Sequence, residues 1–133
     1  MIEHGLNTVL SRRSVGDTVD TLVAMVEDAG LTVFARIDHG AGAAAAGLPL
    51  RPTELLVFGN AHAGTPLMQA NQVVGIDLPM KALAWEDENG EVWVTYPDAG
   101  WIGARHGLGS DLAEAIDAIR SGVAKLIMGA AGT

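Results

Sequence analysis

A chain of 133 residues is the size of one domain, and its hydrophobic share of 49% is enough to form a single core. Sixteen acidic and eight basic side chains give a net charge of -8, which repels the phosphates of nucleic acids and anionic lipids. Cysteine is absent, which excludes disulfides, thiolate metal sites and cysteine nucleophiles. No apolar run approaches the roughly 20 residues of a membrane helix, and the segment Met1 to Leu6 does not read as a secretory signal. We therefore expect a cytoplasmic protein. Together with the net charge, the lack of such a run predicts that it binds neither nucleic acid nor membrane.

The first predicted elements are a strand and a helix. Leu6 to Ser11 is a short apolar stretch with the length of a strand. Asp17 has the short acceptor side chain of a helix N-cap, and Gly30 suits the left-handed residue after a helix end. Between them the helical i, i+3, i+4, i+7 spacing is met by Val19, Leu22, Val23 and Val26.

Two strands are predicted next, on either side of a glycine and alanine stretch. Leu31 to Asp38 alternates between two faces, and Thr53 to Phe58 is more uniformly apolar and ends at the turn residues Gly59 and Asn60. Residues 40–47 lack the glycine spacing of a dinucleotide-binding loop and the strand-helix-strand context that such a loop needs. We therefore predict a short alanine helix that ends at Gly47.

The middle of the chain predicts a short helix and a hairpin. Thr65 and Pro66 have the residue types of an N-cap and a first helical position, so a helix is expected from Leu67 to about Val73. Asp77-Leu78-Pro79 should end it. The strands Met80 to Glu86 and Glu91 to Tyr96 flank a turn that ends in Asn89 and Gly90, residues that readily adopt positive φ angles.

A loop and a long helix complete the prediction. Residues 98–109 are expected to be a loop that carries Trp101, Arg105 and His106. Asp111 and Glu114 have the spacing of a capping box. The apolar stripe of the helix that follows consists of Leu112, Ile116, Ile119, Val123, Leu126 and Ile127.

The order strand, helix, strand, strand, short helix, strand, strand, helix predicts an α+β fold, with a largely antiparallel sheet of about five strands. Each long helix has one apolar stripe, so both should pack on the same face of the sheet. Phe34, Trp85 and Trp93 are then expected on the uncovered face, where a partner could cover them.

Several motifs resemble one known family. They are Ile37-Asp38-His39, Ala43 to Gly47, Arg51 to Asn60, Gly64 to Met68, Asp77-Leu78-Pro79, Trp85-Glu86-Asp87, Tyr96 and Ala104 to Leu108. Over about residues 14–109 the chain resembles the domain of unknown function 302 family. The resemblance implies a compact fold with a strongly bent antiparallel sheet backed by helices, implies homo-oligomers, and implies no established activity. Ala61-His62 departs from the proline and lysine that the family often has there.

Asp38 and His39 stand at the end of a predicted strand. A carboxylate beside an imidazole can act as an acid/base pair or bind a ligand, and equally Asp38 can cap the next segment while His39 bonds to backbone. Arg51 is the preferred anchor for an anionic ligand because a guanidinium grips carboxylates and phosphates with two hydrogen bonds. Its alternative role is an ion pair with Glu54 or Asp77.

Two further pairs of residues complete the candidate ligand site. Asn60 and Thr65 bracket a turn after an apolar strand, where they bind a ligand or only fix the turn and cap a helix. Arg105 and His106 are either ligand groups or a surface pair. Histidines 4, 39, 62 and 106 lack zinc-binding spacing, so we expect no metal and no cofactor.

Two functional hypotheses follow. One is a protein, with or without catalytic activity, that binds a small ligand at a pocket gathered from Asp38, His39, Arg51, Asn60 and Arg105-His106. The other is a non-catalytic interaction module, a homodimer closed through the uncovered face of the sheet.

Overall fold

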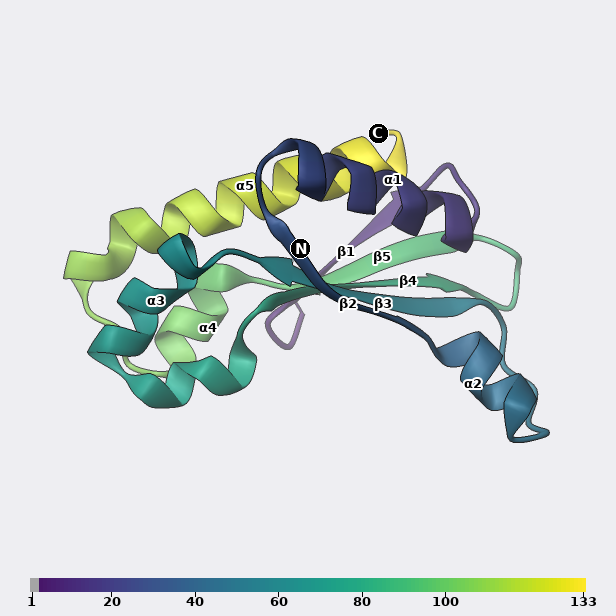
Figure 1. Cartoon of the computed structure of the whole chain (residues 1–133), viewed down its shortest axis with the longest axis horizontal. Coiled ribbons are helices and arrows are strands. Elements are labelled where there is room, and N and C mark those ends of the chain that lie inside the picture. The colour runs from purple at the N-terminus through teal and green to yellow at the C-terminus, as the bar shows by residue number, and fades with distance from the viewer. Residues whose placement is uncertain (1–2) are drawn as a thin grey trace.

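The computed structural model describes residues 3–133, which form a five-stranded antiparallel sheet with helices on both sides (Figure 1). The strands follow the order β1-β5-β4-β3-β2 across the sheet. This confirms the predicted α+β fold class. The expectation about a secretory signal falls partly on Met1 and Ile2, which lie outside the described residues. The strands are β1 (Leu6–Ser11), β2 (Thr32–Asp38), β3 (Thr53–Gly59), β4 (Met80–Glu86) and β5 (Val92–Pro97).

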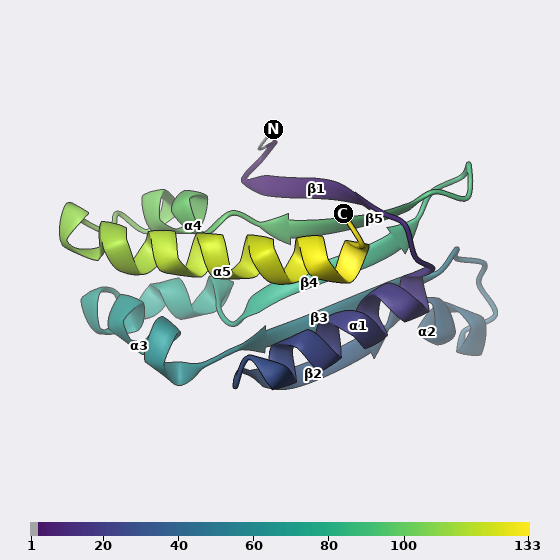
Figure 2. The same ribbon diagram turned by 90° about the horizontal axis from the view of Figure 1, so that it is seen from above.

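Helices α1 (Val15–Asp28) and α5 (Ala113–Ala131) lie together on one face of the sheet, as their single apolar stripes require (Figures 1 and 2). α1 is capped by Ser14, whose hydroxyl accepts from the Asp17 amide, so the prediction of Asp17 as N-cap was wrong. Ser14 precedes the first helical residue and has an extended backbone, which is the geometry that a cap needs. Gly30 follows the helix with a φ of 77°, as predicted.

α5 begins after a short 3-10 turn, η2 (Ser110–Leu112). Leu112 occupies its N-cap position without a side-chain hydrogen bond, so the predicted capping box of Asp111 and Glu114 does not form. The other end of α5 is held by Arg13, whose Nη1 donates to the carbonyls of Gly129 and Ala130. A guanidinium at this position satisfies carbonyls that have no partner within the helix and faces the negative end of its dipole.

The shorter helical segments between strands are α2 (His39–Ala45), α3 (Ala61–Ala70) and the 3-10 helix η1 (Gln72–Asp77), and α4 (Ala99–Arg105) leads from β5 toward α5. α2 is the predicted alanine helix. α3 starts six residues before the predicted Leu67, because Asn60 and not Thr65 is its cap, and Pro66 lies inside it. α4 replaces the predicted loop, because the buried carboxylate of Asp98 accepts from the Trp101 amide and starts a helix.

The core lies between the sheet and the α1/α5 layer. Alternate residues of β3, β4 and β5 are buried on this face. Side chains from both helices close over them, as the burial of Leu22, Val26 and Ile127 shows. This alternation leaves every second residue of the central strands on the other face.

The opposite face of the sheet, called the open face here, is covered by neither α1 nor α5. Directly paired residues share a face, so the register assigns to it Thr8, Leu10, Ala35, Ile37, Thr53, Leu55, Val57, Lys81, Leu83, Trp85, Trp93 and Thr95. Trp85 and Trp93 stack with ring centroids 6.5 Å apart, which agrees with their predicted side. Phe34 was wrongly placed there, because a bulge between Val33 and Ala35 breaks the alternation and turns Phe34 toward the helix side, where it lines a pocket.

Candidate functional site

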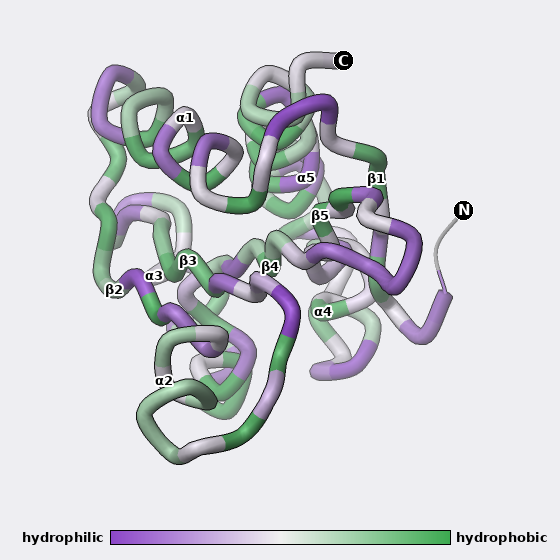
Figure 3. The backbone as a smooth tube through the Cα atoms, turned by 90° about the vertical axis from the view of Figure 1, so that its right-hand side faces the viewer, coloured by the Kyte–Doolittle hydropathy of each residue, from purple (hydrophilic) through white to green (hydrophobic). Residues whose placement is uncertain are grey.

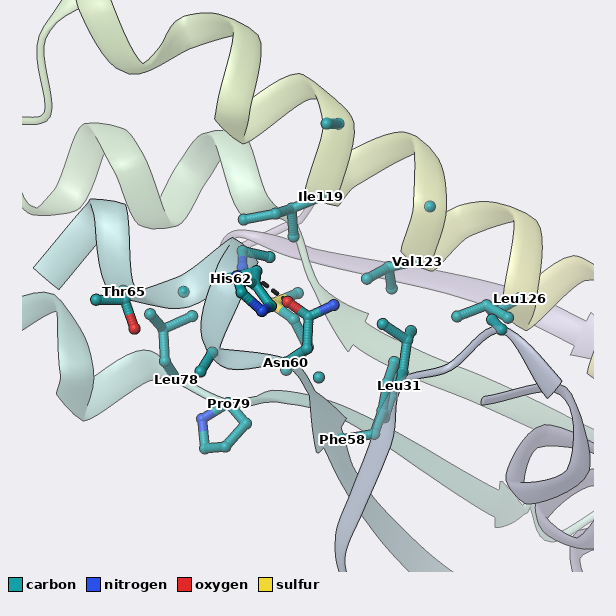
Figure 4. A pocket seen from close by; sticks show the side chains of 18 of the residues that line it. Leu31, Phe58, Asn60, His62, Thr65, Leu78, Pro79, Ile119, Val123 and Leu126 are labelled. Carbon is teal, nitrogen blue, oxygen red and sulfur yellow. Dashed lines mark hydrogen bonds between the residues drawn. The ribbon is translucent and has the colours of Figure 1, made fainter. Parts of the chain in front are cut away.

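A large apolar pocket lies at one end of the helix-covered face. Its volume is about 1060 Å³, and its walls come from the end of α1, β2, the end of β3, α3, η1, the start of β4 and residues 115–126 of α5. Figure 4 shows Leu31, Phe58, Leu78, Ile119, Val123 and Leu126 around this space. Ligand sites are typically concave, mostly apolar and of this order of size.

Short side chains create the hollow. α5 faces it with Ala115, Ala118 and Gly122, and α3 contributes Ala61, Ala63 and Gly64. A Cβ placed on Gly122 would meet no other group within 4 Å, so the space beside α5 is open at that point. In the core proper the same helix presents Ile116 and Ile127, both buried. The pocket therefore opens where small residues of α5 alternate with the larger Ile119, Val123 and Leu126.

Polar groups occur at a few points of the wall. Asn60 accepts the Ala63 amide through Oδ1 at 2.7 Å, which fixes the amide side chain at the start of α3. His62 and Thr65 follow on α3, while Asp28 is the last residue of α1 and Lys125 lies in the second half of α5. A mostly apolar wall with a few polar groups holds an uncharged body and orients it by one polar end.

Of the seven residues predicted as ligand-binding, the structure brings only Asn60 and Thr65 to this pocket. Most of its apolar wall was not predicted from the sequence. Its residues come from seven separate elements, and each reads locally as an ordinary core position. The one available signal was the run of small residues on one side of the last helix, at Ala115, Ala118 and Gly122.

Asp38, His39 and Arg51 gather at the opposite end of β3. Asp38 Oδ1 accepts from the Ala41 amide at 2.8 Å and so caps α2, and exposed Arg51 donates from Nε to the Glu86 carbonyl at 3.3 Å. Seven residues of extended β3 separate them from Asn60, which corresponds to roughly 20 Å. The predicted candidates therefore do not form one site.

The ion-pair partners proposed for Arg51 bind other arginines. Glu54 pairs with Arg36, whose Nε donates to its carboxylate at 2.8 Å, and Arg36 also reaches Asp20 on α1 at 2.7 Å. The hydrogen bond to Glu54 raises the pKa of Arg36 further. These pairs attach the outer strand β2 to the helix layer.

Arg105 and His106 bind Asp77. Arg105 Nη1 lies 3.0 and 3.1 Å from the two carboxylate oxygens, and His106 Nε2 lies 2.6 Å from Oδ2. The guanidinium also stands 5.6 Å from the ring centroid of Trp101. Asn71 Nδ2 donates to the His106 carbonyl at 3.1 Å. This cluster anchors η1, whose residue Gly75 lines the pocket, to the end of α4.

Asp98 carries a second polar cluster, beneath α4. Its carboxylate is 4% exposed and accepts from Arg120, from the Trp101 amide and from Asn7. Burial alone would raise the pKa of Asp98, but the hydrogen bonds from these groups and the charge of Arg120 outweigh it and lower the pKa. The pair joins α5 to the start of α4 and is structural.

Two other titratable groups are perturbed near the sheet. The indole of Trp93 donates to Asp87 at 2.9 Å, and this bond lowers the pKa of the carboxyl group together with the amides of Asn89 and Glu91. Burial raises the pKa of Tyr96. Asp87 thus closes the β4-β5 turn and orients Trp93 on the open face.

Among residues 3–133 the structure contains no cluster of three or more histidine, aspartate or glutamate side chains arranged to hold a metal ion. In the same described part of the chain, no helix combines the length and the apolar character needed to cross a membrane.

Comparison with known proteins gives one family, and its model, described as Domain of unknown function DUF302, matches residues 7–126. Fluoride-specific ion channel FluC 1 of Brucella suis biovar 1 (strain 1330) is 48% identical over 132 residues, 99% of this chain and 52% of that protein. Fluoride-specific ion channel FluC 2 of Brucella melitensis biotype 1 is also 48% identical over 132 residues, 49% of that protein. The chain thus spans about half the length of these curated relatives.

One solved structure is similar over almost the whole chain. The crystal structure of an uncharacterized conserved protein DUF302 from Bacillus stearothermophilus gives a TM-score of 0.79 and covers 98% of both chains. Its sequence is 18% identical, so the similarity shows the shared fold.

Proposed function

The chain belongs to the family called Domain of unknown function DUF302, and we propose that it binds a small, largely apolar molecule in the pocket between α3, α5 and the end of the sheet. The pocket itself carries the proposal. An apolar hollow of about 1060 Å³ leaves partly buried side chains such as Met68 and Leu78 beside solvent, and filling it with an apolar ligand removes that surface from water.

The charges around the pocket favour a ligand without a large net charge. One acid, Asp28, and one base, Lys125, line the wall, so the two formal charges there cancel. The body of the ligand lies against Met68, Leu78 and Ile119, and a single polar group of the ligand reaches Asn60 or His62. An anion would instead favour the other end of the sheet, where Arg51 and His39 are exposed.

A thermal-shift screen tests which end binds a ligand. Purified protein is heated with a panel of neutral apolar molecules and with small anions such as phosphate and acetate, and the variants Ala118→Phe and Arg51→Ala are run in parallel. Ala118 is exposed and lines the pocket, so phenylalanine fills it without disturbing the core. We expect stabilisation by apolar molecules in wild type and Arg51→Ala, and its loss in Ala118→Phe. Stabilisation by anions alone, lost in Arg51→Ala, contradicts the proposal.

A second function, an interaction module that forms a homodimer, is supported by the chemistry of the open face. Lys81 is the one charged member of its twelve residues, although the whole chain carries -8. The half-buried pair Trp85 and Trp93 lies among aliphatic residues there. Large aromatic residues inside an uncharged patch are typical of the centre of protein interfaces. Light scattering at micromolar concentration measures the dimer directly, and a strict monomer contradicts it.

The name of the Brucella relatives suggests a context for such a module. Those proteins are called fluoride channels, and this chain corresponds to about half of each. We propose that a unit of this kind works beside a channel, where it binds a ligand or a second copy, and does not itself bind fluoride. Calorimetry with sodium fluoride, with sodium chloride as control, should show no specific heat. A saturable fluoride signal overturns this part of the proposal.

A further inference from the structure

Helix α2 has too few contacts to account for its own stability. Its seven residues, His39–Ala45, include Gly40 and Gly42, and none of the seven, all of which the structure describes, is buried. An isolated helix shorter than about 12 residues is marginal in water even when rich in alanine, and each glycine costs about 1 kcal/mol relative to alanine. The cap from Asp38 offsets only part of this cost.

The residues beside α2 add exposed apolar surface. Leu48 is 64% exposed and Leu50 is 52% exposed, both in the segment that returns from α2 to β3. Ile37, which precedes α2 on β2, is 42% exposed. Three large apolar side chains in contact with water at one end of the molecule, next to a helix without a fully buried residue, indicate a surface that another molecule covers.

The position of α2 indicates which surface it reaches. α2 projects to the side of the sheet opposite α1 and α5, the side of the open face (Figures 1 and 3). The twelve residues of the open face include eight apolar ones and a single charge, Lys81. Two copies of a strongly acidic chain repel each other elsewhere, and this face is where they can approach without that repulsion.

The area available supports a second copy as the partner. Five strands spaced by about 4.8 Å and about six residues of 3.4 Å each give a face of roughly 480 Å², or about 1000 Å² for two copies. A stable interface needs at least about 1000 Å² in total, so the open face alone stands at the lower limit. α2 and the exposed leucines supply the additional surface that can raise the buried area above this limit.

We propose that residues 39–52 form a clasp, which packs on the open face of a second copy and there buries α2, Leu48 and Leu50. The inference rests on the homodimer proposed above and names the segment that completes it. In a two-fold pair the same contact occurs twice, so each clasp covers the face of the other copy. The clasp at one end of each sheet then fixes how the two sheets lie on each other.

The test compares two double variants of the full chain, and each replaces two exposed apolar residues by serine. Leu48→Ser with Leu50→Ser removes the apolar part of the clasp. Val73→Ser with Ile76→Ser is the matched control, because these residues are 66% and 72% exposed and lie on η1, away from residues 39–52. All four side chains are exposed in the single chain, so circular dichroism should show both variants folded. Sedimentation measures the dimer dissociation constant from nanomolar to millimolar protein.

We expect a dimer in wild type, dissociation constants within about twofold of wild type for the η1 pair, and weakening of about tenfold or more for the clasp pair. A wild-type monomer removes both the dimer and the clasp. If the clasp pair dimerises as tightly as wild type, or if both pairs weaken the dimer equally, the clasp proposal is wrong and the dimer proposal stands. Hydrogen exchange of the α2 amides gives an independent readout, since the clasp predicts protection that rises with protein concentration.

Discussion

Gly122→Leu is a direct test of the apolar pocket. Gly122 lies in α5 and lines the pocket, and a Cβ built on it meets nothing within 4 Å. A leucine there enters open space. The substitution therefore blocks the pocket while it repairs a weak position of the helix, and these two effects have opposite consequences for ligand binding and for stability.

The gain in stability follows from two contributions. Replacing glycine by leucine inside a helix contributes about 0.8 kcal/mol through helix propensity. Placing about half of the leucine side chain against the pocket wall contributes about 1 kcal/mol more. For a domain of this size a total gain of about 1 to 2 kcal/mol raises the melting temperature by roughly 3 to 8 °C. The substitution should thus yield a more stable protein with less ligand affinity.

The assay combines thermal unfolding with titration of a neutral apolar fluorescent probe such as N-phenyl-1-naphthylamine. Ser121→Leu is the control, because Ser121 is an exposed neighbour on the same helix that does not line the pocket. We expect Gly122→Leu to lose about tenfold or more in probe affinity, as a blocked pocket predicts, and Ser121→Leu to bind like wild type. Equal probe binding by all three proteins, or destabilisation by Gly122→Leu, would show that no ligand pocket opens beside Gly122.

Three further predictions use urea unfolding. Asn60→Ala removes the cap of α3 and should cost about 1 kcal/mol, whereas Thr65→Ala inside the same helix should change stability by less than about 0.5 kcal/mol. Asp98→Asn should cost about 1 to 2 kcal/mol at neutral pH because it weakens charge-assisted bonds to Arg120. The pKa of Asp98 is lower in the folded state than in the unfolded state. The stability that its charge contributes is therefore fully present above the unfolded-state pKa of about 3.9 and is lost as the pH falls through the folded-state pKa. Asp98→Asn should flatten the acid side of the curve of stability against pH. Ile127→Ala, at a fully buried core position, should cost about 2 to 5 kcal/mol.

Most of the fold could be predicted because its signals are local. The alternation of β4 and β5 around Asn89-Gly90 and the stripes of α1 and α5 follow from periodicity alone. Apart from the bulge at Phe34, the errors occurred where a side chain other than the predicted one caps a helix. Asn60 caps α3 instead of Thr65, and Asp98 starts a helix where a loop was expected. Asparagine, aspartate, serine and threonine are all capable caps, so sequence alone does not decide among them.

The candidate site was harder to predict because it depends on which residues lie close together in the folded chain. Asp38, Arg51 and Asn60 all stand beside strand ends, as predicted, but β3 places Asn60 at one end of the sheet and the other two at the opposite end. A strand end alone does not say which end of the sheet it occupies until the pairing is known. The apolar wall escaped notice for a related reason: residues such as Leu78 and Ile119 resemble core residues unless the space between them is seen.

The pocket and the open face both follow from the way two helices cover five strands. α5 has 19 residues and α1 has 14, so their lengths are about 28 and 21 Å. α5 extends past α1 and over α3 and α4 (Figure 1). Under that overhang α5 has Ala115 and Ala118 in place of larger residues, and no second long helix fills the space, so the pocket stays open. Both long helices are used on one face, and the other face keeps its tryptophans available for a partner. A ligand at the overhang and a second copy on the open face can therefore be bound together, because they occupy opposite sides of the same sheet.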